Sequence, residues 1–144
     1  MAVQNSLPRK VSIAADSVIP SLGVQLSKTT GINMKATGQT TLYTVPTGKS
    51  AIITHLLVRV TSASNVTGVP VITAGITPSW TSVLASTTLT SLDATGEYYL
   101  IQVTQPAAIV AAAGVVKLDV ATGATTTGGG DTYVVEVRLF GFLI

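Results

Sequence analysis

The stretches SAIITHLLVRVT, residues 50–61, and DTYVVEVRLFGFLI, residues 131–144, decide the fold class of this chain. In the later stretch one set of alternate positions is entirely apolar: Tyr133, Val135, Val137 and Leu139. The earlier stretch has a similar set: Ile52, Leu56, Val58 and Val60. Because successive side chains of a β-strand point to opposite faces, each stretch predicts a strand with one buried face and one mixed face.

Further runs rich in β-branched residues predict strands at residues 41–45, 69–74, 82–89, 97–103 and 115–120. Thr-Gly pairs recur between several of these runs, and glycine allows the positive φ angles that turns require. No amphipathic helix of normal length is evident. About seven or eight short strands separated by turn signals predict an all-β, antiparallel β-sandwich. Residues 122–130, TGATTTGGG, are expected to form a mobile loop between the last two strands.

The first 36 residues differ from the rest, because small apolar groups there alternate with polar residues, prolines and a glycine. We expect residues 1–36 to form an extended arm and residues 37–144 to form the sandwich. An arm of this kind can lay its apolar groups on a neighbouring molecule and add to an exposed sheet edge. The residues expected to bind a partner are Arg9, Lys10, Val11, Ile13, Val18, Ile19, Leu22, Val24 and Leu26. The alternative, an N-terminal strand packed against its own domain, stays open.

Composition indicates assembly. The 144 residues suit one domain, and only 10% of them are charged, against about a quarter in a typical soluble domain. Neighbouring subunits that withdraw part of the surface from water would explain the deficit of charged residues.

The absence of cysteine excludes disulfides and thiolate chemistry. The basic residues are scattered singly, so nucleic-acid binding is not expected, and the longest apolar stretch is shorter than the ~20 residues of a membrane-spanning helix.

The sequence offers little for catalysis. His55 is the only histidine and has no acid beside it in the sequence, so neither a catalytic nor a ligand role is expected. The spacing of the carboxylates matches no metal-binding loop; they are Asp16, Asp93, Glu97, Asp119, Asp131 and Glu136. Asp93 and Glu97 bracket a turn that could hold calcium, although a solvated turn is the preferred interpretation. We therefore expect no cofactor and no enzymatic activity.

The aromatic residues leave one binding alternative open. Trp80, Tyr98 and Tyr99 are the residues that could form a sugar-stacking surface, although packing in the core or at an interface is the favoured interpretation.

Two segments carry a resemblance to a known class of proteins. Residues 40–61, TTLYTVPTGKSAIITHLLVRVT, contain a strand, a Tyr-Thr-Val-Pro group, a Gly-Lys turn and a long strand that ends near Val-Arg. Residues 133–144 close with VEVRLFGFLI, an aromatic-Gly-aromatic ending. Both segments resemble small β-sandwich virion proteins of tailed bacteriophages, and together they bracket about 100 residues.

The resemblance implies a jelly-roll-like domain that acts as a head decoration or cement protein on the outer surface of the phage head. Its expected partner is the major capsid protein. A homo-oligomer is also implied, with a trimer favoured over a dimer. Related folds serve in tail fibres, so a tail-fibre or receptor-binding module that recognises host-surface glycans is the alternative.

Overall fold

A computed structural model describes residues 23–103 and 109–144, which form strands and no helix. The strands are β1 (Val24–Asn33), β2 (Gly38–Thr44), β3 (Ala51–Ala63), β4 (Val66–Gly68), β5 (Val71–Ile76), β6 (Ser79–Thr88), β7 (Tyr98–Gln102), β8 (Ile109–Val110), β9 (Val115–Thr122), β10 (Thr125–Thr126) and β11 (Tyr133–Leu143). Each strand predicted from the sequence has a counterpart among them, and the all-β prediction is confirmed.

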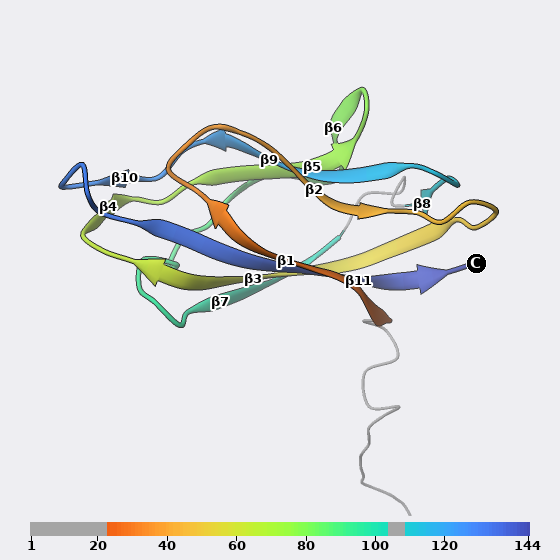
Figure 1. Cartoon of the computed structure of the whole chain (residues 1–144), viewed down its shortest axis with the longest axis horizontal. Coiled ribbons are helices and arrows are strands. Elements are labelled where there is room, and N and C mark those ends of the chain that lie inside the picture. Colours follow the sequence, from red (N-terminus) through yellow and green to blue (C-terminus); the bar gives the residue numbers. More distant parts are fainter. Residues whose placement is uncertain (1–22, 104–108) are drawn as a thin grey trace, which may run out of the picture.

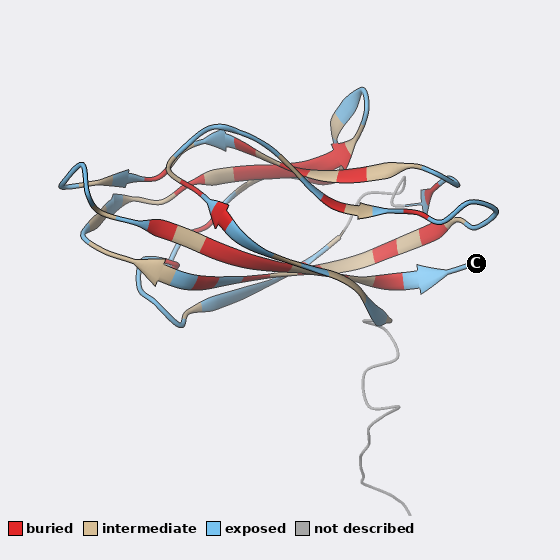
Figure 2. Ribbon diagram, viewed as in Figure 1, coloured by how far each residue is buried: buried red, intermediate tan, exposed pale blue. Residues whose placement is uncertain are grey.

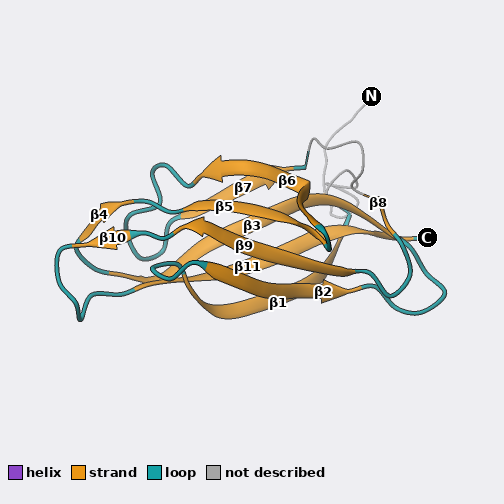
Figure 3. Cartoon of the chain, turned by 90° about the horizontal axis from the view of Figure 1, so that it is seen from above, coloured by secondary structure: helices purple, strands orange, loops and turns teal. Residues whose placement is uncertain are grey.

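Two sheets stack to form a sandwich, seen in Figure 1 as an upper and a lower layer. One sheet has the order β1-β11-β3-β7, with β8 also paired to β3, and the other has the order β2-β9-β5-β6. All paired strands are antiparallel, and β10 and β4 form a separate two-stranded ribbon at one end (Figure 3). The first long strand lies beside the last, and β1, β2 and β3 alternate between the two sheets. This order is consistent with the jelly-roll-like arrangement that the resemblance implies.

The core lies between the sheets and is lined by the inward positions of their central strands, as the buried segments in Figure 2 show. On β11 the predicted apolar set is fully buried, with Tyr133, Val135, Val137 and Leu139 each 0% exposed. On β3 the prediction fails at one position, because Ile53 is buried and Ile52 is not. Phe140 pairs with His55 but Gly141 pairs with Ile53, so a bulge at Thr54 reverses the alternation of the strand.

The expected start of the sandwich at residue 37 needs correction. Residues 24–33 form β1, which pairs with β11 of the same chain, and Ile32 and Met34 lie in the core. Leu26 packs against the core from a partly buried position, whereas Val24 is 61% exposed. Pairing with β11 places β1 at the edge of a sheet of its own domain, as the open alternative supposed. Of the predicted arm, residues 1–22 lie outside the described residues, and these include the other seven predicted contacts, Arg9, Lys10, Val11, Ile13, Val18, Ile19 and Leu22.

The segment 122–130 has more structure than its composition predicts. Thr125–Thr126 forms β10, and Asp131 anchors the turn that follows it. The Asp131 carboxylate accepts hydrogen bonds from the Gly128 backbone N–H at 2.6 Å, the Asn65 amide at 2.8 Å and the Ser64 hydroxyl at 3.2 Å. The Asn65 and Gly128 bonds are the main reason why the pKa of Asp131 lies below its usual value. A single carboxylate therefore organises a segment that the sequence predicts to be a mobile loop.

The close approach of strands at Gly141 generates a stability prediction. A Cβ atom at Gly141 would lie 2.0 Å from the Ile52 carbonyl oxygen, whereas a Cβ at Gly129 would meet nothing within 4 Å. Gly141→Ala should lower the free energy of unfolding by about 1–3 kcal/mol, because backbone must move to admit the methyl group. Gly129→Ala, the matched control, should change it by less than about 0.5 kcal/mol. Urea unfolding checks both, and equal stability of the two variants would contradict this account of the strand packing.

Candidate functional site

The outer face of the β1-β11-β3-β7 sheet is unusually apolar. Its outward positions alternate with buried residues on the same strands. Seven apolar side chains occupy this surface, which we call the apolar face: Ile52, Leu57, Tyr98, Leu100, Ile109, Phe140 and Phe142. Four of them are strongly exposed: Tyr98 at 70%, Ile109 at 57%, Leu100 at 45% and Phe142 at 38%.

The strand register aligns these side chains in rows across the sheet. Ile109 on β8 lies opposite Ile52 on β3, and Ile52 lies opposite Phe142 on β11. Two outward positions along the sheet, beyond the row of Phe140, His55 and Gln102, Leu100 on β7 lies opposite Leu57 on β3. Directly paired side chains on one face of an antiparallel sheet are close enough to touch. These apolar side chains therefore occupy three successive rows of the sheet, of which the middle row also holds His55 and Gln102, and exposed apolar patches mark interaction surfaces in soluble proteins.

A short charged row borders the apolar face. Glu136 on β11 accepts a hydrogen bond from Arg138 Nε at 2.9 Å, and its other oxygen lies 3.2 Å from Lys28 Nζ on β1. Burial raises the pKa of Glu136, but the bonds from Arg138 and Lys28 outweigh it and hold that pKa below its usual value. Arg59 lies on the other side of Glu136 and next to Tyr98 in the register. These four charged residues carry a net positive charge, which favours a partner surface with carboxylates.

The outer face of the second sheet is different. Its aligned rows are polar or small, as in Gln39–Asp119–Thr73 and Thr41–Lys117–Gly75. Trp80 on β6 belongs to this side of the molecule, and Lys117 Nζ lies 5.6 Å from the centre of its ring. The two outer faces of one sandwich thus differ in chemistry, and among the described residues only the first face offers extended apolar area.

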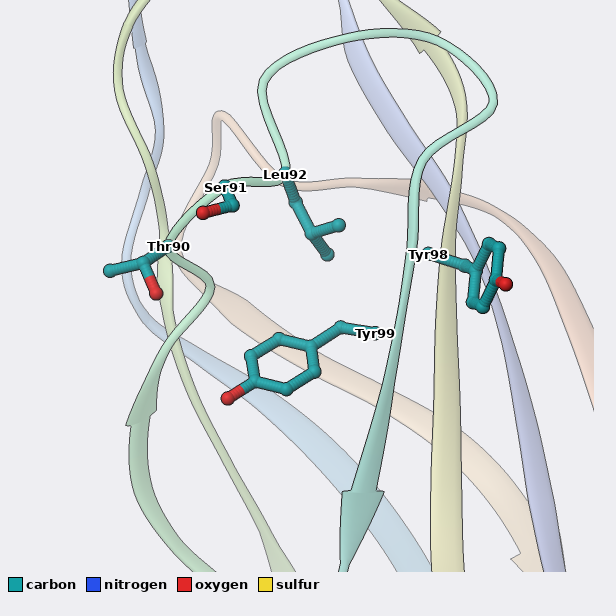
Figure 4. Close-up of a pocket in the computed structure, with 5 residues that line it drawn as sticks. All are labelled: Thr90, Ser91, Leu92, Tyr98 and Tyr99. Atoms are coloured by element: carbon teal, nitrogen blue, oxygen red, sulfur yellow. The ribbon is translucent and has the colours of Figure 1, made fainter.

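A shallow pocket lies at the edge of the sandwich, where the loop from β6 enters β7. Its volume is about 260 Å³, and its lining residues are Thr90, Ser91, Leu92, Tyr98 and Tyr99. Figure 4 shows the Tyr99 ring extending from β7 toward Thr90, below Leu92, whereas the Tyr98 ring lies on the other side of the strand. Adjacent residues of a strand point to opposite faces, so Tyr98 belongs to the apolar face and Tyr99 to the pocket.

The three aromatic residues considered for sugar stacking therefore do not form one surface. Trp80 stacks with Lys117 on the second sheet, and the two tyrosines face opposite ways. Sequence analysis also did not single out Leu57, Leu100, Ile109 and Phe142 as surface residues. The available signal was the hydrophobic character of both parities in the two long strands, since a strand with one solvated face would alternate apolar with polar residues.

The residues considered for catalysis or metal binding either lie apart from one another or bond to other groups of the chain. Among the described residues, no three His, Cys, Asp or Glu side chains gather to hold a metal ion. Glu97 Oε2 accepts bonds from the backbone N–H groups of Asp93 at 2.8 Å and Ala94 at 2.6 Å, so this carboxylate closes its own turn. His55 lies opposite Phe140 and Gln102, with a buried Nδ1 that has no partner, and burial lowers its pKa. Asp16 lies outside the described residues.

Comparisons with known proteins found no matching family model, no similar curated protein and no similar solved structure. Across residues 23–103 and 109–144, the chain contains no helix of the length and apolarity needed to cross a membrane.

Tyr133 links the core to the pocket loop and generates a pH prediction. Its hydroxyl donates to the Leu92 carbonyl, and burial, together with Glu97 and Asp93, raises its pKa to about 12. Because the folded state holds the neutral phenol, this stabilisation is complete below the unfolded pKa of about 10 and declines as pH rises above it. Tyr133→Phe should cost about 1–3 kcal/mol at pH 7, since it leaves a buried carbonyl unpaired.

The difference in unfolding free energy between wild type and Tyr133→Phe should shrink by about 1.4 kcal/mol between pH 9 and pH 11, because only the wild-type unfolded chain gains this ionisation. Urea unfolding at both pH values measures it. A difference that stays constant over this range would contradict the assigned role of the phenol.

Proposed function

We propose that this protein is a structural virion protein, a capsid decoration or cement protein on the outer surface of the head of a tailed bacteriophage. It binds the major capsid protein lattice through apolar area and is itself a homo-oligomer, with a trimer favoured over a dimer. The observation that carries the proposal is the apolar face, a set of exposed apolar side chains on one outer side of a sandwich whose opposite outer face is polar.

In this proposal, binding depends on the apolar area that the contact buries. A specific protein–protein contact buries about 800 Å² on each partner, and large apolar side chains at its centre supply most of the binding free energy. Tyr98, Leu100 and Phe142 provide such side chains on strands, where backbone pairing fixes their positions. Copies on a symmetric lattice would add avidity, so each contact can be weak by itself. The resembling segments include β3 and β11, which carry four of the seven residues of this surface, and the other three lie on β7 and β8, the strands paired with β3.

Particle stability tests the proposal directly. Heads assembled without this protein should rupture at a lower temperature or force than heads that carry it, because cement contacts bridge neighbouring capsid subunits. Thermal release of packaged DNA, followed by fluorescence, measures the difference. Identical release curves for bare and decorated heads would contradict a cement function.

A single substitution tests the surface. Leu100→Asp places a carboxylate on the apolar face and should weaken binding to bare heads by roughly tenfold or more, since the charge must lose water on docking. Thr41→Asp is the matched control, because it adds the same group to an exposed strand position of the second sheet. Its binding should stay within about twofold of wild type. Sedimentation of heads with bound protein measures both, and equal loss in the two variants would contradict docking through this surface.

A tail-fibre or receptor-binding module that recognises host-surface glycans is the second candidate function. The observation that favours it is the pocket beside Tyr99, where an exposed aromatic ring lies near hydroxyl-bearing side chains. Binding of host-surface glycans by the isolated protein would support this candidate.

A further inference from the structure

We propose that the pocket between the β6–β7 loop and Tyr99 binds a single ring of a neutral saccharide. The inference deepens the second candidate function by naming a site and a ligand class, and it does not require a particular place on a virion. A decoration protein that carries this pocket would bind the same ring.

The size and chemistry of the pocket fit one sugar ring. Its volume of about 260 Å³ lies below the 300–1,000 Å³ of pockets for drug-sized ligands. The lining combines an aromatic ring and an aliphatic side chain, Tyr99 and Leu92, with the hydroxyls of Thr90 and Ser91. A pyranose presents the same combination, with C–H groups on its faces and hydroxyls around its rim. None of the lining residues carries a charge at neutral pH, so a neutral sugar matches the site better than an acidic one.

The hydroxyls of the pocket are free to serve a ligand. Elsewhere in the described structure many hydroxyls bond to the protein, as Ser62 does with Thr132 at 2.7 Å and Thr67 with Thr125 at 3.1 Å. Among described residues, the side-chain oxygens of Thr90, Ser91, Tyr98 and Tyr99 make no such bond. A sugar hydroxyl can replace the water on these groups and keep their hydrogen bonds, whereas an apolar ligand would leave them unpaired.

The pocket loop is held in place before any ligand arrives. Glu97 Oε2 binds the two backbone N–H groups of its turn, Val60 N–H donates to the Glu97 carbonyl at 2.8 Å, and Gly96 N–H donates to the Val60 carbonyl at 2.9 Å. From below, the buried Tyr133 hydroxyl holds the Leu92 carbonyl. Ser91 has a φ of 67°, a left-handed conformation that is uncommon for residues other than glycine. Residues held in such conformations cluster at binding sites, and a fixed loop lowers the entropic cost of binding.

Within the site, Tyr99 is the stacking platform. Tyr99 is 40% exposed and its ring extends into the pocket, whereas Tyr98 faces away from the pocket on the apolar face. Leu92 lies almost fully buried and provides the apolar floor. One aromatic ring with two hydroxyls predicts weak binding, with a Kd of about 1 mM for one sugar ring.

Saturation-transfer NMR on the full chain tests the inference, with the methyl glycosides of glucose, galactose, mannose, N-acetylglucosamine and N-acetylgalactosamine as probes. At least one neutral glycoside should bind with a Kd of about 1 mM, and N-acetylneuraminic acid should bind at least about fivefold more weakly. Failure of all five neutral probes to bind at 10 times that concentration, roughly 10 mM, would overturn the inference. It would leave the cement function untouched, since that function is measured by head stability.

Substitutions locate the site. Tyr99→Ala should weaken the bound glycoside at least about tenfold, and Tyr99→Phe, which keeps the ring, should weaken it less than about threefold. Trp80→Phe is the matched aromatic control on the second sheet and should leave the Kd unchanged. Melting temperatures of all variants show that they are folded. Full binding by Tyr99→Ala, or equal loss in Trp80→Phe, would overturn the assignment.

Discussion

The pairing of β3 with β11 is the constraint on which the rest of the molecule depends. These strands run antiparallel from the Tyr133–Ala63 pair to the Leu143–Ala51 pair, at the centre of the first sheet. Their inward side chains, among them Leu56, Val58 and Leu139, are fully buried and form much of the core floor. Every other strand of that sheet attaches to one of the two: β1 to β11, and β7 and β8 to β3. If these two strands were not paired in this register, neither face of the sheet would present a defined set of side chains.

This central pair also explains why the outer faces differ. Strands buried on both sides are apolar at both parities, whereas strands with a solvated side alternate. Leu57, Phe140 and Phe142 place apolar groups outward from β3 and β11, although no second layer of this chain covers them among the described residues. On β9 and β2, by contrast, the outward groups are those of Lys117, Asp119 and polar neighbours. We interpret the outward apolar residues of β3 and β11 as a face that another molecule covers. This interpretation is the basis of the proposed adhesive function.

Sequence reasoning was most accurate where alternation was unbroken. Tyr133, Val135, Val137 and Leu139 recur with a period of two, and both the strand and its buried face were predicted correctly. It was least accurate at bulges. In β1 the register skips between Gln25 and Ser27 and again between Thr29 and Ile32, so no period of two survives and the segment resembled an arm. The role of Asp131 was also missed, because its side-chain partners Ser64 and Asn65 lie 67 and 66 residues earlier in the sequence.

The amino-acid sequence by itself determined the class of the fold, the long central strands, the single-domain size and the scarcity of charge, because these follow from composition and from local alternation. The tertiary structure alone decided which face of the first sheet remains uncovered, that Tyr98 and Tyr99 serve different surfaces, and that residues 24–33 belong to the sandwich. The physical reason is that register and bulges join residues that are distant in the chain. A local sequence pattern does not determine which of the two apolar faces of a strand packs against the rest of the same chain.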